Sequence, residues 1–515
     1  MRGRSIQSTF GASILGTLLA CSSPAADGPE AASMEPGDAA APDTSAPPAA
    51  LPAAGARPNV VVVVVDDLRY DELGVTGHPY VETPNIDRLA AEGALFERAF
   101  HAVPLCSPNR ASLLTGQYPS RHGIIDNVAR NLASHGLKTF PAALQRNGYA
   151  TAFLGKWHMG NDPTPRPGFD EWVALPGQGR SENPVFFEDG ELREVEGYTT
   201  DILTDRAVEF IRDREGPFAV YLAHKAVHPD IAQLDDGSVD PATSRGFVPA
   251  PRHLGRYDQA VFPRHPSTIT SLDDLTGKPA IRHALESRRP GNPTELLGDA
   301  EGMGTNDLTI RRRAEMLLAV DDGVGRIVAT LEELGILDET VIVFTSDNGY
   351  FYGEHGLTSE RRMPYEESIR NPLIVRYPPR VAAGSRPDGL VSTVDLAPTI
   401  LDLTGTPIGE HIQGRSVVPL FDGDDDGWRS SLLVEFYTYE NPFPHLVDMD
   451  YRLVRTARMK YIHWMQHPGM DELYDLESDP YETRNRIDDP ALADERQRLR
   501  TELGRLVLEA MGLGG

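Results

Sequence analysis

The sequence predicts an α/β protein whose mostly parallel central sheet is covered by helices on both faces. Short apolar runs alternate with helical segments along the chain, which is typical of folds built from βαβ units. Residues 60–65 are six consecutive valines, and such a run indicates a strand that is buried on both faces. Polar residues stand just past the carboxyl ends of the predicted strands, where open α/β sheets bind their ligands.

The elements follow in order from the valine run. It ends at Asp66-Asp67, and Thr83-Pro84-Asn85 then begins a helix that ends before Gly93. We expect further strands at 150–154 and 218–223, each ending close to a lysine or histidine.

The clearest helix spans residues 308–334. Its apolar side chains recur at spacings of three, four and seven, and Gly335 follows its end. A strand at 341–344 comes next and ends at Ser346-Asp347-Asn348-Gly349. These elements complete a predicted catalytic domain at 58–427, interrupted at 230–307 by a Pro-, Gly- and Asp-rich segment that we interpret as an insertion or long surface loops.

The character of the sequence changes near Trp428. Residues 432–436, 451–456 and 460–464 have the composition of short antiparallel strands, and a helix is expected from 490 to 511. We therefore predict a smaller C-terminal subdomain at 428–515, with an antiparallel sheet and a helix.

The N-terminus has the pattern of an export signal. Arg2 and Arg4 precede a weakly apolar run that ends at Cys21. Residues 1–20 resemble a bacterial lipoprotein signal, so we expect a lipidated Cys21 and an exported, periplasmic or outer-surface lipoprotein of a bacterium; an ordinary signal peptide is the alternative. Residues 21–57 have the Ala- and Pro-rich composition of a disordered linker. The apolar run is shorter than the roughly 20 residues of a membrane-spanning helix.

The charge balance limits the possible partners. The chain has 76 acidic and 49 basic residues and a formal net charge of −27. This argues against a broad nucleic-acid surface, and an anionic substrate would require a local basic pocket. With only two cysteines, Cys21 and Cys106, no disulfide framework is expected.

Two strand ends carry candidate metal ligands. Asp66 and Asp67 follow the valine strand, and Asp347 and Asn348 follow the strand at 341–344. Carboxylate and amide oxygens are the ligands that Ca²⁺ or Mg²⁺ prefers, although Asp and Asn-Gly also mark simple turns. The lack of Cys/His ligand spacing argues against structural zinc.

Cys106 is predicted to lie at the start of a helix. Ser107 can serve as its N-cap and Pro108 fits its first position, so the partial positive charge of the helix would favour an anion or an ionised nucleophile there. The alternative is a buried cysteine that only packs. Lys156 and His158 follow one strand and His228 follows another; taken alone, Lys156 and His158 fit a surface lysine and a core histidine better than an active site.

The stretch Cys106-Ser-Pro108-Asn-Arg110 followed by Ala-Ser-Leu-Leu-Thr-Gly resembles the signature of the formylglycine-dependent sulfatases of the alkaline-phosphatase superfamily. The chain also carries Asp-Asp, Gly-Lys-Trp-His, His-Pro, Ser-Asp-Asn-Gly and Tyr-Glu-Glu in the order that this family uses, over residues 58–487. Several stretches are more similar to glycan sulfatases, in particular N-acetylglucosamine-6-sulfatase-like members, than to aryl-specific ones.

The resemblance implies a role for each candidate residue. A formylglycine-generating enzyme would oxidise Cys106 to an aldehyde, and one hydroxyl of its hydrate would attack sulfur while the second later expels sulfate. Arg110 and Lys156 would orient residue 106, and His158 and His228 would transfer protons. The metal would be Ca²⁺, with Mg²⁺ as the alternative, and it would be held by these residues: Asp66, Asp67, Cys106, Asp347 and Asn348.

Two residues depart from the family pattern. Asn109 stands where Ser or Ala is usual, which bears on recognition by the oxidising enzyme. Arg361 stands where a catalytic lysine is usual, four residues before Tyr365. Because arginine does not release a proton at accessible pH, we expect Arg361 to clamp sulfate rather than to act as a general acid.

The sequence thus predicts an exported sulfuric ester hydrolase that acts on a sulfated glycan. A phosphonate or phosphate ester hydrolase of the same superfamily is the first alternative. A non-catalytic lipoprotein that binds sulfated glycan is the second, and it requires Cys106 to remain a thiol.

Overall fold

The structure is a computed structural model that describes residues 57–513, except 189, 241–242, 270, 288–305, 358–360 and 439–446. The predicted signal peptide, Cys21 and the linker up to residue 56 lie outside the described residues. Among the residues described, no helix is both long and apolar enough to cross a membrane.

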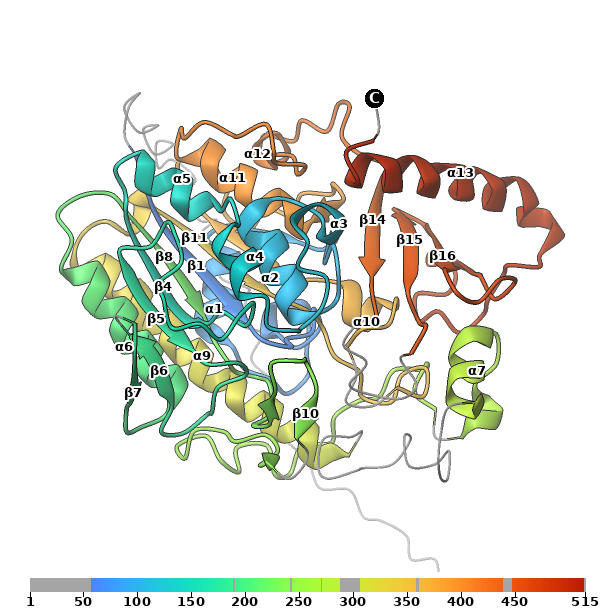
Figure 1. The fold of residues 1–515 in the computed structure, drawn as a ribbon, viewed down its shortest axis with the longest axis horizontal. Coiled ribbons are helices and arrows are strands. Elements are labelled where there is room, and N and C mark those ends of the chain that lie inside the picture. The colour runs from blue at the N-terminus through green and yellow to red at the C-terminus, as the bar shows by residue number, and fades with distance from the viewer. Residues whose placement is uncertain are drawn as a thin grey trace, which may run out of the picture. The chain divides into compact units, whose positions relative to one another are not determined.

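A large mixed sheet forms the centre of the fold (Figure 1). Its strands, in spatial order, are β2 (Ala94–Phe96), β12 (Leu373–Arg376), β11 (Thr340–Ser346), β1 (Asn59–Val65), β8 (Phe218–Ala223), β4 (Ala150–Lys156), β5 (Glu171–Leu175), β6 (Val185–Glu188) and β7 (Glu191–Glu194). The five strands from β11 to β5 are parallel, and the two outer strands on each side are antiparallel.

The predicted fold class is confirmed, with one refinement. The parallel character predicted for the sheet holds for its centre, where β1 pairs with β8 and β11 over nearly its whole length. The antiparallel edges were not predicted, because β6 and β7 form a local hairpin that needs no crossover helix.

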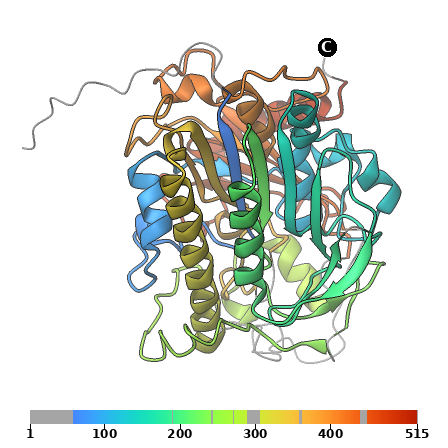
Figure 2. The same cartoon turned by 90° about the vertical axis from the view of Figure 1, so that its left-hand side faces the viewer.

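Helices cover both faces of this sheet. Those that pack on it are α1 (Pro84–Ala91), α2 (Cys106–Thr115), α5 (Phe140–Arg146), α6 (Thr199–Arg212), α9 (Asp307–Glu333), α11 (Leu396–Leu403) and α12 (Val418–Phe421). The shorter helices α3 (Pro119–His122), α4 (Asn131–His135) and α10 (Glu366–Ile369) lie in the connections between these elements. Figure 2 shows α6 and α9 side by side across one face.

The valine run explains why both faces are covered. Val61, Val63 and Val65 pack in a core with α1, α6 and α9. The alternate valines, Val60 and Val62 among them, pack in a second core with α2, α5 and α11. Since successive side chains of a strand point to opposite faces, a strand made only of valine requires an apolar layer on each side.

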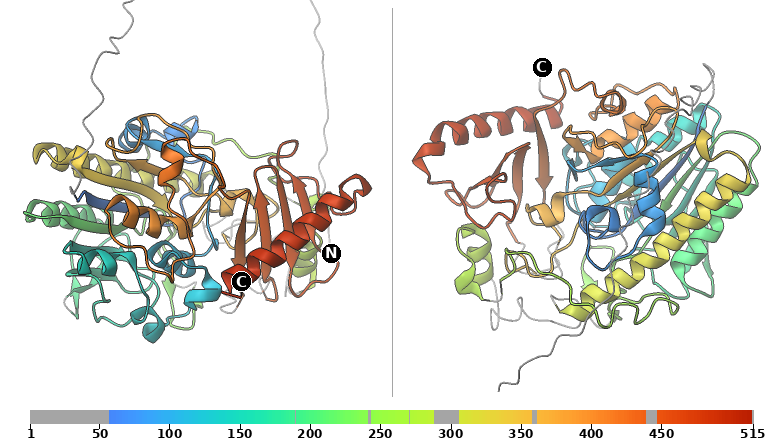
Figure 3. Two further views of the ribbon diagram at one scale, coloured as in Figure 1. Left: turned by 90° about the horizontal axis from the view of Figure 1, so that it is seen from above. Right: turned by 180° about the vertical axis from the view of Figure 1, so that it is seen from behind.

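A separate antiparallel sheet lies in the C-terminal part (Figures 1 and 3). Its strands are β14 (Ser431–Phe436), β15 (Tyr451–Thr456), β16 (Met459–Trp464) and β17 (Glu472–Asp475), and α13 (Ala493–Ala510) packs on it. The first three strands and the helix match the predicted segments within three residues, whereas β17 was not predicted as a strand.

The segment 230–307 contains regular structure as well as loops. It contains the hairpin of β9 (Ala232–Gln233) and β10 (Val239–Asp240), followed by α7 (Pro279–Ser287). Ala280, Ile281 and Ala284 of α7 share a core with the C-terminal sheet. Two further short strands, β3 (Ala99–Phe100) and β13 (Val391–Ser392), pair beside the start of α2.

Candidate active site

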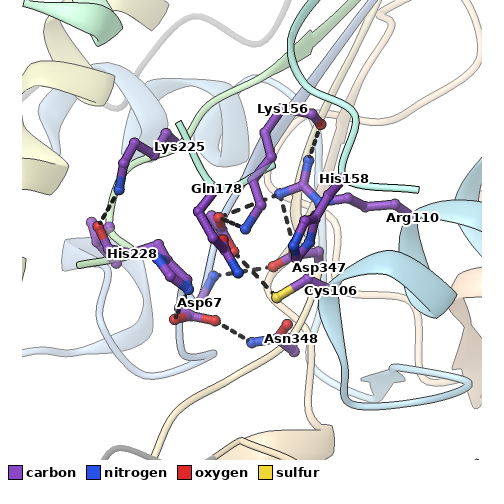
Figure 4. Close-up of polar contacts among 12 residues, drawn as sticks. Asp67, Cys106, Arg110, Lys156, His158, Gln178, Lys225, His228, Asp347 and Asn348 are labelled. Carbon is purple, nitrogen blue, oxygen red and sulfur yellow. Dashed lines mark hydrogen bonds and ion pairs between the residues drawn. The ribbon is translucent and has the colours of Figure 1, made fainter. Parts of the chain in front are cut away.

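The carboxyl ends of β1 and β11 bring the predicted metal ligands together. These strands are parallel neighbours, with Val65 opposite Ser346, so the residues that follow them meet. The backbone N–H of Asp67 donates to Asp347 Oδ1 at 3.1 Å, and Asn348 Nδ2 donates to Asp67 Oδ1 at 2.6 Å. Figure 4 shows these side chains beside Cys106.

Cys106 is the first residue of α2, so the predicted N-cap at Ser107 is wrong. Leu105 takes the N-cap position with an extended backbone, and Asn127 Oδ1 accepts the Ser107 N–H at 3.0 Å. Ser107 Oγ is then available to donate to the carbonyl oxygen of His158 at 2.8 Å. The Cys106 thiol is fully buried and lies 3.7 Å from Asp66 Oδ1.

Two positively charged side chains contact these carboxylates. Arg110 Nε donates to Asp347 Oδ2 at 2.8 Å, and its Nη1 donates to the Lys156 carbonyl oxygen at 2.7 Å. The Lys156 ammonium donates directly to Asp66 Oδ2. Charge-assisted bonds of this kind are short and directional, so they hold the orientation of both carboxylates.

Gly155 is required for Lys156 to reach this place. It lies inside β4 with φ of 117°, and a Cβ there would lie 2.0 Å from the carbonyl oxygen of Ala223 in β8. The glycine of Gly-Lys-Trp-His therefore allows close approach of two strands, a reason that the sequence pattern alone does not reveal.

Arg361 lies between the acids and His228. Its Nη2 donates to His228 Nε2 at 3.0 Å, and its Nε lies 3.3 Å from Asp67 Oδ1. His228 Nδ1 donates to the Pro229 carbonyl oxygen at 2.7 Å. Because arginine only donates, the Nε2 of His228 accepts here and the imidazole is neutral.

Burial and neighbouring charges shift the pKa values of the three aspartates in different directions. Burial opposes ionisation of Asp66, yet the charges of Lys156 and other cations hold its pKa well below its ordinary value. Burial raises the pKa of Asp67, and it raises that of Asp347 to about 7 although Arg110 opposes it. A bound cation would reverse the last two shifts, since it favours the charged form.

Burial also determines the protonation of the other groups. It raises the pKa of the Cys106 thiol far above its ordinary value, so the thiol is protonated at neutral pH and is a poor nucleophile as it stands. Burial and the charge of Lys156 hold the pKa of both His158 and His228 well below the ordinary value, so both rings are neutral.

Two residues of the site have left-handed backbones. Asp67 has φ of 61° and His158 has φ of 67°. Non-glycine residues in this region are strained by about 1–3 kcal/mol, and such strain concentrates at functional sites.

The donor set fits a hard divalent cation. The ligand atoms of Asp66, Asp67 and Cys106 lie within 4.8 Å of one another. Asp67 Oδ2 and Asn348 Oδ1 are buried, and neither has a hydrogen-bond partner within the described part of the chain. A buried carboxylate or amide oxygen without a partner is costly, and a cation would satisfy both.

Comparison with known proteins identifies the family of this chain. The model of the sulfatase family matches residues 58–406, and that of the C-terminal region of N-sulphoglucosamine sulphohydrolase matches 353–509. This chain belongs to the sulfatase family. It is therefore a hydrolase of sulfuric esters, and the predicted family is confirmed.

Individual relatives agree with this assignment. N-acetylglucosamine-6-O-sulfatase of Bacteroides thetaiotaomicron is 33% identical over 485 residues, covering 83% of this chain and 82% of the relative. The solved structure of BT4656 with its substrate, D-glucosamine-2-N,6-O-disulfate, has a TM-score of 0.74 and 31% identity, covering 88% of this chain and 98% of that one. A phosphonate monoester hydrolase of Agrobacterium radiobacter shares the fold (TM-score 0.68, 23% identity, 88% and 96% covered).

All ten predicted site residues thus lie in one contact network of this sulfatase, directly or through a neighbouring residue. Sequence reasoning missed Arg313 of α9, whose Nη2 donates to the Asp67 carbonyl oxygen at 2.6 Å. The available signal was the place of Arg313 in the apolar repeat of the predicted helix, four residues before Leu317; the structure shows it fully buried. It also missed Asn127, Gln178 and Gln233, which lie in segments without periodicity.

Proposed function

We propose that this sulfatase removes sulfate esters from a glycan, with residue 106 as formylglycine and Ca²⁺, or alternatively Mg²⁺, in the site. The observation that carries the proposal is the buried set of oxygens and cations around Cys106. The protonated thiol supports it further, because the unmodified side chain offers neither a good nucleophile nor an oxygen ligand. The hydrate of the aldehyde would supply one hydroxyl to attack sulfur and a second whose deprotonation later expels sulfate.

The proposed metal ligands are the residues at the two strand ends. Asp66, Asp67, Asp347 and Asn348 would hold the cation together with an oxygen of residue 106. A bound cation neutralises charge on a sulfate oxygen and lowers the pKa of a hydroxyl that it contacts.

The other site residues would orient the ligands, bind sulfate and transfer protons. Arg110 keeps Asp347 oriented, and Lys156 places a positive charge beside residue 106. Arg361 provides the fork that we propose for binding sulfate oxygens. His158 and His228, neutral and adjacent to this charge, are the groups proposed to transfer protons.

A 6-O-sulfated glucosamine is the substrate class that we favour. The support is the identity of 33% to an N-acetylglucosamine-6-O-sulfatase and the likeness to a structure whose substrate is D-glucosamine-2-N,6-O-disulfate. Phosphonate or phosphate ester hydrolysis is the second candidate, because a phosphonate monoester hydrolase has the same fold.

We also propose that the enzyme is exported and anchored by a lipid on Cys21. In that case Cys21→Ser moves the enzyme from the membrane fraction to the soluble exported fraction. If the wild-type enzyme is already soluble after processing, the proposed lipid anchor on Cys21 is wrong, and the proposed catalytic function is unaffected.

The mass of the peptide around residue 106 tests the mechanism. We expect the mass of an aldehyde in place of the thiol, and an active enzyme with an intact thiol would refute it. Turnover of an aryl sulfate against the matching aryl phosphonate separates the two hydrolase functions. If the peptide has the mass of the unmodified thiol and the protein turns over neither ester, a glycan-binding protein is favoured.

A further inference from the structure

Two glutamines that the sequence did not point to form a hydrogen-bond network with the His158 ring. Gln178 lies in the loop after β5, and Gln233 lies in β9 of the 230–307 segment. The oxygen of the Gln233 amide is 2.5 Å from His158 Nε2 and 2.7 Å from Gln178 Nε2. The nitrogen of the same amide donates to the Gly237 carbonyl oxygen at 2.7 Å.

These bonds determine which nitrogen of His158 carries the proton. A carbonyl oxygen only accepts, so the Gln233 nitrogen must face Gly237 and its oxygen must face His158. The amide oxygen also only accepts, so His158 Nε2 must donate. In a neutral imidazole one nitrogen donates and the other accepts, which makes Nδ1 the acceptor.

The hairpin that carries Gln233 is fixed to the rest of the fold. Gln233 pairs with Val239 across β9 and β10, and the Ala129 N–H donates to the Asp235 carbonyl oxygen at 2.8 Å. The orientation of the Gln233 amide is therefore set before a substrate arrives.

Two acceptors remain in this network without a hydrogen-bond partner among the described residues: His158 Nδ1 and Gln178 Oε1. The two side chains are only 4% and 3% exposed. The bond from Ser107 to the His158 carbonyl ties this ring to the residue after Cys106, and Figure 4 shows His158 and Gln178 among the side chains around Cys106. Two buried acceptors require donors, and hydroxyl groups in the site would provide them.

We propose that Gln233 is a positioning residue that holds His158 as the Nε2–H tautomer, with Nδ1 as the acceptor that faces the site, and that Gln178 Oε1 accepts a hydrogen bond from a hydroxyl of the substrate sugar. This deepens the proposed function and rests on it for the role of Gln178. It also gives the 230–307 segment a part in the reaction.

The tautomer can be read without substrate. In histidine-labelled full-length enzyme, ¹⁵N NMR reports which ring nitrogen carries the proton, and His158→Asn identifies the signal because asparagine tolerates a left-handed backbone. We expect the proton on Nε2 in wild type, in Gln178→Met and in Gln233→Glu, which keeps an acceptor. In Gln233→Met we expect the ring proton of His158 to occupy Nδ1 in at least part of the molecules.

A wild-type proton on Nδ1, or a Gln233→Met spectrum identical to wild type, would overturn the positioning role. If Gln233→Met does not fold, loss of the Nε2–H signal in Gln233→Ala supports the role, and its persistence there overturns it.

Kinetics test the two glutamines separately. Gln233→Met should lower kcat on the order of 10- to 100-fold, the range typical of partners that orient a functional histidine, and Gln233→Glu should restore part of it. Gln178→Met should raise KM for a 6-O-sulfated glucosamine about three- to tenfold more than KM for an aryl sulfate, as one lost hydrogen bond predicts. An equal effect on both substrates would overturn the role of Gln178. If wild type releases no sulfate from either ester, the proposed function fails while the NMR result stands independently.

Discussion

Arg361 provides the sharpest test of the site, because it stands where the family pattern has a lysine. Its guanidinium contacts both His228 and Asp67, at 3.0 and 3.3 Å. Arg361→Ala removes both contacts and the proposed clamp on sulfate, so we expect kcat and the affinity for substrate to fall together.

The size of the loss follows from these contacts. Hydrogen bonds to charged groups contribute about 1.5–3 kcal/mol each, and donors that stabilise a developing anion contribute about 2.7–4 kcal/mol to catalysis. For Arg361 we take about 2–4 kcal/mol, which spans most of both ranges. We therefore expect kcat/KM to fall by about 30- to 900-fold, since each 1.36 kcal/mol is a factor of ten.

Arg361→Lys separates charge from geometry. The lysine keeps a positive charge and restores the family residue, so this variant should retain more activity than Arg361→Ala. The alkaline limb of its pH–rate profile should move, because an active-site lysine can titrate and arginine does not.

Steady-state kinetics with an aryl sulfate measures these effects. Arg380→Ala serves as the control, because Arg380 pairs with Asp422 at 3.0 Å on the surface and exposed pairs contribute little. If Arg361→Ala equals wild type in kcat/KM, the correspondence of Arg361 to the family lysine is wrong, and Arg362 becomes the next residue to test.

Other substitutions test the remaining parts of the structure. Cys106→Ala should abolish sulfate release with little change in Tm, because within the described part of the chain the thiol makes one hydrogen-bond contact, a long one to Asp66; retained turnover would contradict its role as nucleophile precursor. Asp347→Ala should lose the metal and activity together, and elemental analysis that finds full metal content would remove it from the ligands. Asn109→Ala should lower the free energy of unfolding by roughly 3 kcal/mol, since it removes the hydrogen bonds of Asn109 to the buried His101 ring nitrogen, the Asp347 carbonyl oxygen and the Thr393 hydroxyl, and of these Thr393 keeps another bond, from the Ala102 N–H; denaturant titration measures this. Burial opposes the charge of His265, but its bonds to Asp71 and a glutamate raise its pKa to about 9. The resulting stability, roughly 3 kcal/mol, should be complete below about pH 6.5 and lost as the pH rises through about 9, and His265→Gln should abolish that dependence in thermal melts.

The sequence alone determined the local features of this sulfatase. Six consecutive valines can only be stable with an apolar layer on each side, so the buried strand and its two covering layers were predictable. The ligand-bearing residues were predictable for a similar reason, since Asp66-Asp67 and Asp347-Asn348 follow strands that end at the same edge of the sheet.

The tertiary structure decided everything that depends on contacts between distant segments. The N-cap of α2 is Leu105 and not the predicted Ser107, because Asn127, some twenty residues later, accepts the Ser107 N–H. The antiparallel edge formed by β12 and β2 pairs segments that lie far apart in the chain, and an isolated strand sequence does not specify its partner. The tautomer of His158 depends on Gln233, which is 75 residues away in a segment without periodicity. Hydrogen-bond direction and proton position are properties of paired groups, so they exist only once folding has placed both partners.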